Sequence, residues 1–482
     1  RAALGEVQRP TGEEPEVGCL QPEPPSVAGK PTMNGAVGRA ARPAHRHRAH
    51  HPIPKILRTR IRPIKWSERY LEQPEILRYL EHVAARHDLK RDICFNTRVT
   101  GAQFDEASGR WNVRTDAGDA VTARFLITAV GTLSDTSLPP FEGLERFRGR
   151  WYHTSRFPRG GVDFTAKRVA VVGTGASAVQ AIPQIAQQAK QRRVFQRTPN
   201  YCLPARNGKI DPERVAARKA DYDAIIARTR NSFAGFELAR IPKSALEATP
   251  EEREREFERM WDIGGFIFGL GNYQDVLLRR EANKIVADYL DDKIRRVVKD
   301  PAVAEKLVPK KHPFGTKRTP LDTNYYETFN KDSVLLIDAD IDGPIEKITE
   351  KGIRAGGTEY EFDIIVFATG FDAFTGSLKA LNIKGCGGRA LNDAWADGPR
   401  TYLGLSVAEF PNLFTITGPQ SPSVLANMPV AIEQHVEWIA DCIAYMRKHG
   451  LTTIEAVPKA QESWVAHVDE VVNGTLLPLG NS

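Results

Sequence analysis

One glycine-rich stretch has the residue types and spacing of a phosphate-binding turn. Gly173, Gly175 and Ala178 follow the run 168–172, which is apolar after Arg168, and open a segment with helical periodicity. In a strand–turn–helix unit, the first glycine permits the tight turn and the second lets the backbone approach a pyrophosphate. The third small residue lets the helix pack closely on the strand. We therefore predict a dinucleotide site at 168–178, with a plain tight turn as the alternative.

The residues after the next strand, 193–196, distinguish between the two nicotinamide dinucleotides. An NAD site carries an acidic residue there for the ribose hydroxyls, about 20 residues beyond the glycines. This chain has Arg197 and Thr198 instead. A guanidinium favours a 2′-phosphate, which a carboxylate would repel. The prediction is NADPH, and the alternative is an ordinary arginine of the solvated surface.

Two further buried strands end beside a glycine. The run 362–368 leads into Thr369 and Gly370, and the run 125–129 leads to Gly131. A strand that ends on glycine allows another backbone or a ligand to approach closely, although glycine also occurs at ordinary strand ends. Together with the glycine-rich turn, these strand ends favour two dinucleotide folds, one for a flavin and one for the nicotinamide.

Hydrophobic periodicity predicts the elements that would position these residues. From residue 66 onward the chain has the pattern of an α/β protein, with a long, charged helical stretch over 211–305. We expect helices over 73–87, 178–190 and 431–448, and strands over 93–99, 111–115, 121–129, 168–172, 193–196, 333–338, 361–368 and 412–417.

The composition argues against several kinds of partner. The 482 residues carry 67 Lys and Arg against 60 Asp and Glu, a formal net charge of +7. Eleven of these cations and five of the acids lie in residues 1–62, so the rest is nearly neutral and we expect no nucleic-acid partner. No apolar run reaches the roughly 18 residues of a membrane span, so we expect no membrane partner either. Five scattered cysteines favour the cytoplasm.

A longer pattern points to a family. Phe147, Gly149, His153 and Phe157 match FxGxxxHxxx followed by an aromatic residue. This is the fingerprint of flavin-dependent Baeyer–Villiger monooxygenases and their N-hydroxylating and flavin-containing cousins. The chain resembles the phenylacetone and steroid monooxygenase branch over about 66–477. The resemblance implies that FAD and NADPH are the cofactors, and that a small ketone and O2 react through a flavin peroxide to give an ester or lactone.

The resemblance also assigns roles to single residues. It makes Arg318 the catalytic arginine beside the flavin, a role that suits a side chain which stays protonated and supplies fixed positive charge. Lys317, Arg197 and Thr198 would contact the 2′-phosphate, and His153 would couple domains. The other cofactor-binding residues would be Gly173, Gly175, Ala178, Val99, Gly131, Thr369, Gly370, Gly418 and Pro419. The substrate pocket would be lined by Ser423, Val424, Leu425 and Met428.

The fold prediction is α/β, with two dinucleotide-binding, Rossmann-like domains and a helical insertion. Residues 1–62 would be a low-complexity segment that precedes the domains. The FAD domain would comprise 63–135 and 371–482, the NADP domain 136–210 and 312–370, and the helical subdomain 211–311.

Three features depart from the family pattern. Phe157 stands where Baeyer–Villiger enzymes usually have Trp, which keeps N- or S-oxygenation open. Residues 1–62 are rich in proline, contain no Phe, Tyr or Trp, and lack the FAD-binding glycine motif. Relatives also continue beyond Ser482. We expect 1–62 to be disordered or a misread segment and the C-terminus to be cut short, and the alternative for the chain as written is a non-catalytic NADP-binding protein.

Overall fold

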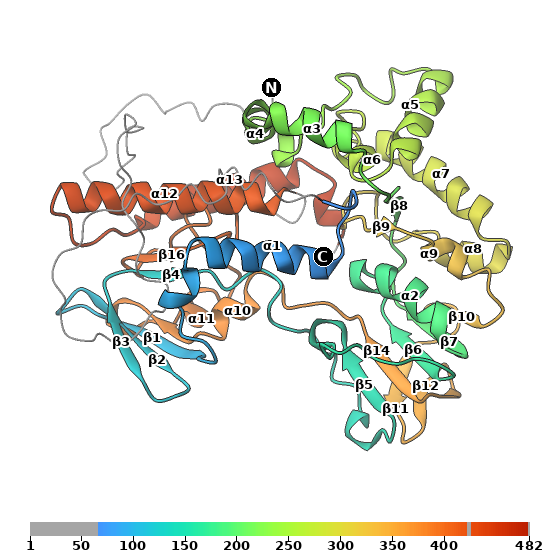
Figure 1. Cartoon of the computed structure of the whole chain (residues 1–482), viewed down its shortest axis with the longest axis horizontal. Coiled ribbons are helices and arrows are strands. Elements are labelled where there is room, and N and C mark those ends of the chain that lie inside the picture. The colour runs from blue at the N-terminus through green and yellow to red at the C-terminus, as the bar shows by residue number, and fades with distance from the viewer. Residues whose placement is uncertain (1–65, 422–425, 481–482) are drawn as a thin grey trace. The chain divides into compact units, whose positions relative to one another are not determined.

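The computed structural model describes residues 66–421 and 426–480, which form two compact units. Unit 1 comprises 66–135, Gly208–Glu237 and Asp372–Val471, and unit 2 comprises Thr136–Asn207, Leu238–Phe371 and 472–480. Each unit combines segments that are distant in the sequence (Figure 1). The segment 1–62 lies outside the described residues.

Unit 2 is built on a five-stranded sheet in which all neighbouring strands are parallel. The strands, in spatial order, are β10 (Val334–Asp338), β7 (Gln191–Gln196), β6 (Arg168–Val172), β14 (Ile364–Phe367) and β5 (Arg150–His153). From its second residue the central strand β6 is apolar and buried, as parallel strands are when both faces of the sheet are covered.

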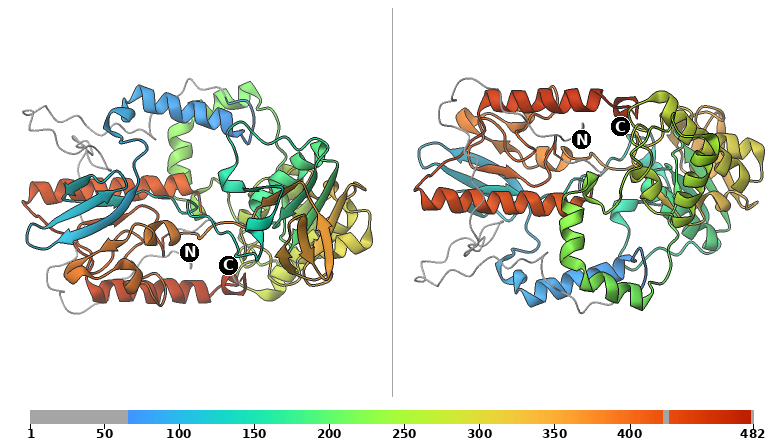
Figure 2. Two further views of the ribbon diagram at one scale, coloured as in Figure 1. Left: turned by 90° about the horizontal axis from the view of Figure 1, so that it is seen from below. Right: turned by 90° about the horizontal axis from the view of Figure 1, so that it is seen from above.

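Alternate residues of β6 belong to two different cores, because successive side chains of a strand point to opposite faces. Val169 and Val171 pack with helix α2 (Ala176–Gln188). Ala170 and Val172 pack with residues of a small antiparallel sheet, whose strands are β11 (Ile345–Ile348), β12 (Gly352–Ala355) and β13 (Thr358–Glu361). The five-stranded sheet therefore has helix on one face and sheet on the other (Figures 1 and 2).

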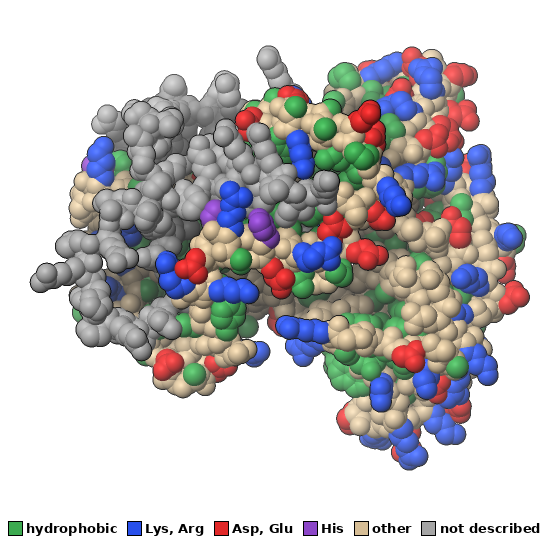
Figure 3. All heavy atoms as spheres, in the orientation of Figure 1, with side chains coloured by type: hydrophobic (Ala, Val, Ile, Leu, Met, Phe, Trp, Pro, Cys, Tyr) green, Lys and Arg blue, Asp and Glu red, His purple; other side chains and the backbone are tan. Residues whose placement is uncertain are grey.

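Some of the remaining helices of unit 2 enclose an aromatic core. Phe257 and Phe268 are at most 2% exposed and lie 5.7 Å apart between ring centroids. Charged residues of both signs cover the outside of these helices on the face shown in Figure 3, and Lys293 pairs with Glu258 at 2.8 Å. The elements of this core are α5 (Pro250–Ile263), α6 (Ile267–Leu270), α7 (Arg280–Val297) and the paired strands β8 (Leu203–Pro204) and β9 (Leu321–Asp322). Helices α8 (Pro301–Leu307) and α9 (Tyr325–Thr328) belong to the core of α2 instead.

Unit 1 contains two small sheets. Strands β1 (Val99–Asp105), β2 (Arg110–Thr115) and β3 (Ala120–Ala123) are antiparallel, and β15 (Ile383–Lys384) runs parallel to β1. Strands β4 (Leu126–Thr128) and β16 (Leu413–Thr415) form a separate parallel pair. The helices are α1 (Gln73–Arg86), α3 (Pro212–Ala220), α4 (Tyr222–Arg230), α10 (Gly376–Lys379), α11 (Leu391–Ala394), α12 (Met428–Lys448) and most of α13 (Pro458–Asn473). No helix in the described residues is long and apolar enough to span a membrane.

Two of the expected strands are wrong. The segment 93–98 is irregular, because Asn96 has a φ of 54° and the apolar side chains of Ile93 and Phe95 are exposed. The expected strand 121–129 is two strands, β3 and β4, which belong to different sheets. The expected helical stretch 211–305 is helical but divided, since Gly208–Glu237 belongs to unit 1 and the rest to unit 2.

Candidate functional site

The glycine-rich turn lies at the carboxyl end of β6, between that strand and α2. Gly173 has a φ of 110°, which L side chains rarely adopt, and a Cβ there would lie 2.5 Å from the carbonyl oxygen of Ala368. The Gly173 N–H donates to the carbonyl of Phe195 at 2.9 Å. Only glycine therefore allows the chain to turn between the ends of β7 and β14.

Gly175 is the N-cap of the 13-residue helix α2. A Cβ on Gly175 would meet no atom within 4 Å, and no side chain of the described residues caps the helix. The open space and the uncapped N–H groups suit an anion at the helix N-terminus. Ala178 is fully buried against the sheet, as close helix packing requires. The turn thus fits the pyrophosphate of a dinucleotide.

Two neighbouring cations lie next to this turn. The hydroxyl of Thr174, within the turn, donates to the carbonyl of Thr198 at 3.0 Å, so the residue after Arg197 contacts the turn. Partial burial, and then the charge of Arg197, lower the pKa of Lys317. Neither cationic side chain has a hydrogen-bond or ion-pair partner among the described residues. Two adjacent cations without a carboxylate suit the 2′-phosphate of NADPH.

Arg318 lies in a turn that is fastened to the segment after β7. The side-chain amide of Asn200 donates to the carbonyl of Arg318 at 3.0 Å, and Nε2 of His312 lies 3.1 Å from the carbonyl of Pro199. The Arg318 guanidinium is exposed and lies 6.0 Å from the ring centroid of Phe266. The predicted catalytic arginine and the predicted phosphate ligands are therefore at the same edge of the sheet.

The fingerprint residues build the edge strand β5 into unit 2. Phe147 is buried in the core shared with β11–β13. A Cβ on Gly149 would lie 2.5 Å from the Phe147 ring and 2.6 Å from the carbonyl oxygen of Asp363, so a larger residue would displace the strand. Phe157 packs against Tyr152 on the helix side, with ring centroids 5.6 Å apart. Packing within unit 2 thus accounts for three of the four fingerprint residues, Phe147, Gly149 and Phe157.

His153 ends β5 beside the end of β14. Its Nδ1 accepts from the Ser155 N–H at 3.3 Å and lies 2.7 Å from the Ser155 hydroxyl. Burial, and then the charge of Arg156, lower the pKa of His153. At the same strand end, Gly370 has a φ of 86° and the Thr369 hydroxyl donates to a carbonyl at 2.6 Å. These surroundings favour a structural role for His153.

In unit 1, the parallel strands β4 and β16 lead to the loops that carry Gly131 and Gly418. Gly131 has a φ of 77°. A Cβ on Gly418 would lie 2.7 Å from the carbonyl oxygen of Gly404, and the carbonyl of Pro419 accepts from Thr401 at 2.8 Å. The two loops thus follow adjacent parallel strands, as the prediction of a second dinucleotide-binding site requires.

The other predicted site residues of unit 1 are not gathered at these strand ends. Val99 begins β1, in the other sheet, and Met428 begins α12. Ser423, Val424 and Leu425 lie outside the described residues.

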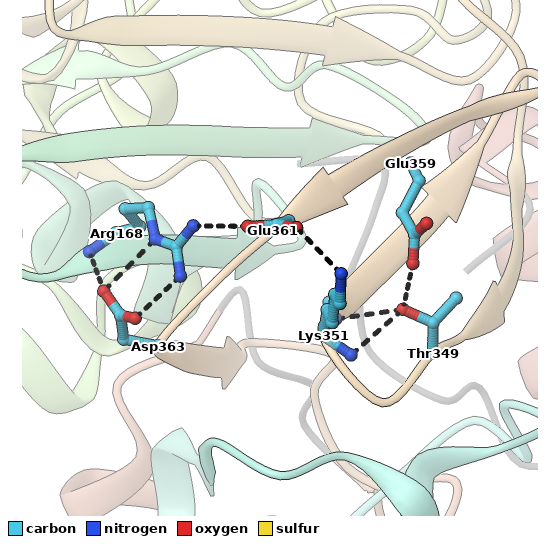
Figure 4. Close-up of polar contacts among 7 residues, drawn as sticks. Arg168, Thr349, Lys351, Glu359, Glu361 and Asp363 are labelled. Carbon is cyan, nitrogen blue, oxygen red and sulfur yellow. Dashed lines mark hydrogen bonds and ion pairs between the residues drawn. The ribbon is translucent and has the colours of Figure 1, made fainter.

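The amino-terminal edge of the five-stranded sheet has a contrasting set of charges. Arg168 begins β6 and pairs with Asp363 at 2.9 Å and with Glu361 at 2.8 Å, and Lys351 lies 3.6 Å from Glu361 (Figure 4). Hydrogen bonds from Arg168 lower the pKa of both carboxyl groups. These four residues line a cavity of about 630 Å³, and both cations among them have carboxylate partners. Arg150 and Lys167 line the same cavity without an ion-pair partner among the described residues.

Comparison with known proteins decides the family. Residues 65–219 match the flavin-binding monooxygenase-like family. A Baeyer–Villiger monooxygenase of Pseudooceanicola batsensis is 43% identical over 424 residues, which cover 88% of this chain and 77% of the relative. This chain belongs to the Baeyer–Villiger monooxygenases.

Two solved structures are similar to this Baeyer–Villiger monooxygenase. An oxidized steroid monooxygenase bound to NADP is 50% identical, with a TM-score of 0.83 over 86% of this chain and 79% of its own. OTEMO in complex with FAD and NADP is 42% identical, with a TM-score of 0.85 over 87% of this chain and 80% of its own. The predicted family and the predicted α/β fold with two Rossmann-like domains are confirmed. The domain limits and the roles of single residues stay predictions.

Sequence reasoning missed the buried polar residues that hold this site of the monooxygenase. Asn283 on α7 is 3% exposed and bonds both backbone groups of Phe314 at 2.9 Å. The sequence indicates its burial only through helical spacing, because Asn283 lies on the same apolar stripe of α7 as Val286 and Leu290. Thr174 and His312 carry no such signal, since their partners are backbone carbonyls that are distant in the sequence.

Proposed function

We propose that this chain oxidises a ketone to an ester or lactone with NADPH and O2, and that Arg318 is its catalytic arginine. The observation that carries the proposal is the position of Arg318. It directly follows Lys317, which lies near Arg197 and the glycine-rich turn, so one turn would serve both the phosphate and the reaction. Bound FAD supplies the activation of oxygen.

The contribution of Arg318 is fixed positive charge. A guanidinium stays protonated at any working pH, so it stabilises negative charge that develops on oxygen during attack on a carbonyl. The carbonyl of Arg318 accepts from the side-chain amide of Asn200 at 3.0 Å, and the residue as a whole is exposed. This bond fixes the backbone from which the charged side chain extends.

The contribution of Arg197, Thr198 and Lys317 is selection of the nicotinamide cofactor. The two cations lie close enough for the charge of Arg197 to lower the pKa of Lys317, a repulsion that a bound 2′-phosphate would relieve. Gly131, Gly418 and Pro419, at the adjacent ends of β4 and β16, would contact the flavin.

The cysteines favour a cytoplasmic location, because those in the described residues form no disulfide: Cys94, Cys202, Cys386 and Cys442.

The test is product analysis with the full chain, FAD, NADPH and a panel of cyclic and aliphatic ketones under ¹⁸O2. We expect an ester or lactone that contains one ¹⁸O atom. Arg318→Ala should lower ester formation roughly 100-fold or more, the usual effect of removing one group that stabilises developing charge. Lys310→Ala is the matched control, because Lys310 is exposed nearby and pairs with Glu305 at 3.1 Å.

Other products would contradict the proposal. Oxidation of amines or sulfides without any ester would assign the chain to N- or S-oxygenation. NADPH binding without oxygen consumption would make it a non-catalytic NADP-binding protein.

A further inference from the structure

A buried asparagine holds the turn that carries Lys317 and Arg318. Asn283 lies on α7 and is 3% exposed. Its Oδ1 accepts from the Phe314 N–H at 2.9 Å, and its Nδ2 donates to the Phe314 carbonyl at 2.9 Å. Nδ2 also donates to the carbonyl of Val276 at 2.8 Å. One side chain thus pairs both backbone groups of residue 314, as a neighbouring strand would.

The turn between Phe314 and Lys317 is short and tightly constrained. Gly315 has a φ of 77°, and a Cβ there would lie 2.8 Å from the side chain of Leu277. The Thr316 hydroxyl donates to the Pro313 carbonyl at 2.8 Å. A displacement of residue 314 would therefore be transmitted to Lys317, three residues further on.

Asn283 itself is too buried to serve as a surface ligand, because its amide is already occupied by three backbone groups. Buried donors and acceptors that lose their partners carry a desolvation penalty, so the three bonds define one position for the turn. The position matters at Lys317, because the carbonyl of the next residue, Arg318, accepts from Asn200, three residues after Arg197, at 3.0 Å. Loss of the Asn283 bonds would leave that bond and the contact of His312 with Pro199 to hold the turn, so the position of Lys317 beside Arg197 would be less well defined.

We infer that Asn283 is a positioning residue that sets the preference of this chain for NADPH over NADH, by holding Lys317 beside Arg197. The inference rests on the proposed function, in which these two cations bind the 2′-phosphate. NADH lacks that phosphate. Loss of the anchor therefore weakens binding of NADPH and leaves binding of NADH nearly unchanged.

The test compares two buried asparagines of the same helical region. Asn283→Asp keeps the shape but replaces two donors by an acceptor that faces carbonyl oxygens. Asn272→Asp is the control, because Asn272 is also 3% exposed and bonds the Phe268 carbonyl at 3.1 Å and the Tyr273 N–H at 2.8 Å, outside the turn. Dissociation constants for NADPH and NADH are measured on the full chain with FAD, together with the melting temperature.

We expect Asn283→Asp to raise the NADPH constant about tenfold and the NADH constant less than about twofold, while Asn272→Asp leaves their ratio unchanged. Equal weakening of both cofactors by Asn283→Asp, or an equal ratio change in the control, would overturn the inference. If Asn283→Asp does not fold, Thr316→Val decides, because it loosens the same turn and should shift the ratio in the same direction. Equal affinity of the unmodified chain for both cofactors would instead refute the phosphate site, and the inference with it.

Discussion

The two edges of the five-stranded sheet in unit 2 use positive charge in opposite ways. At the amino-terminal edge, Arg168 is saturated by Asp363 and Glu361. At the carboxyl-terminal edge, Arg197 and Lys317 lie near each other, and no described residue pairs with either side chain. A cation with carboxylate partners stabilises the fold, whereas two adjacent cations without them repel each other until an anion binds. Carboxylate partners therefore distinguish Arg168 from Arg197 and Lys317, although all three residues are cations.

The glycines of the carboxyl-terminal edge give the largest expected effects. Gly175→Ala should leave the melting temperature nearly unchanged, because a Cβ at 175 has open space around it. It should weaken NADPH binding roughly 100-fold, since the methyl group occupies the approach of the pyrophosphate. Titration of the purified protein with NADPH measures the affinity, and thermal unfolding supplies the control.

Gly173→Ala is the matched variant for this experiment. A Cβ at 173 would lie 2.5 Å from the carbonyl oxygen of Ala368, and the φ of 110° alone disfavours alanine by about 1–3 kcal/mol. It should therefore lower both stability and binding. Undiminished NADPH binding by Gly175→Ala would contradict the assignment of the phosphate cradle to this edge.

A substitution at the amino-terminal edge should have a smaller effect than the glycine substitutions, and it should change stability without changing NADPH binding. Arg168→Ala should cost about 1 kcal/mol, discounted because the side chain is 38% exposed, and lower the melting temperature by about 2–4 °C. Because Arg168 lowers the pKa of Asp363, its contribution is present above the unfolded carboxyl pKa of about 3.9 and is lost as the pH falls through the folded value. The stability difference should thus disappear in acid.

The matched variant at this edge is Lys351→Ala, whose side chain is 71% exposed and which should change stability by less than about 0.5 kcal/mol. Thermal unfolding between about pH 3 and pH 7 and NADPH titration measure both variants. A clear loss of NADPH affinity in Arg168→Ala would erase the distinction between the two edges.

The sequence predicted those parts of the site that depend on local backbone chemistry. The glycine-rich turn was predictable because strand, turn and helix are contiguous from 168 to 188. The glycine spacing alone would not have identified the phosphate-binding turn, because the same spacing recurs at Gly385, Gly387 and Ala390. There the turn leads into the 3₁₀-helix Cys386–Gly388, so no long helix begins at the second glycine.

Other parts depend on contacts that the sequence does not reveal. The bonds of Asn283 to Phe314 and of His312 to Pro199 join residues that are 31 and 113 positions apart. The strand expected at 93–99 is wrong for a different reason, because the apolar side chains of Ile93 and Phe95 remain exposed instead of packing in a core. Tertiary packing decided both cases.

The most direct test of the central claim is the ratio of the NADH and NADPH dissociation constants in Arg197→Ala and Lys317→Ala. If Arg197 and Lys317 bind the 2′-phosphate, each variant should lower the ratio about tenfold or more, with NADH binding and the melting temperature nearly unchanged. The Lys310→Ala control should leave the ratio as it is. A ratio unaffected by either cation variant would contradict the account.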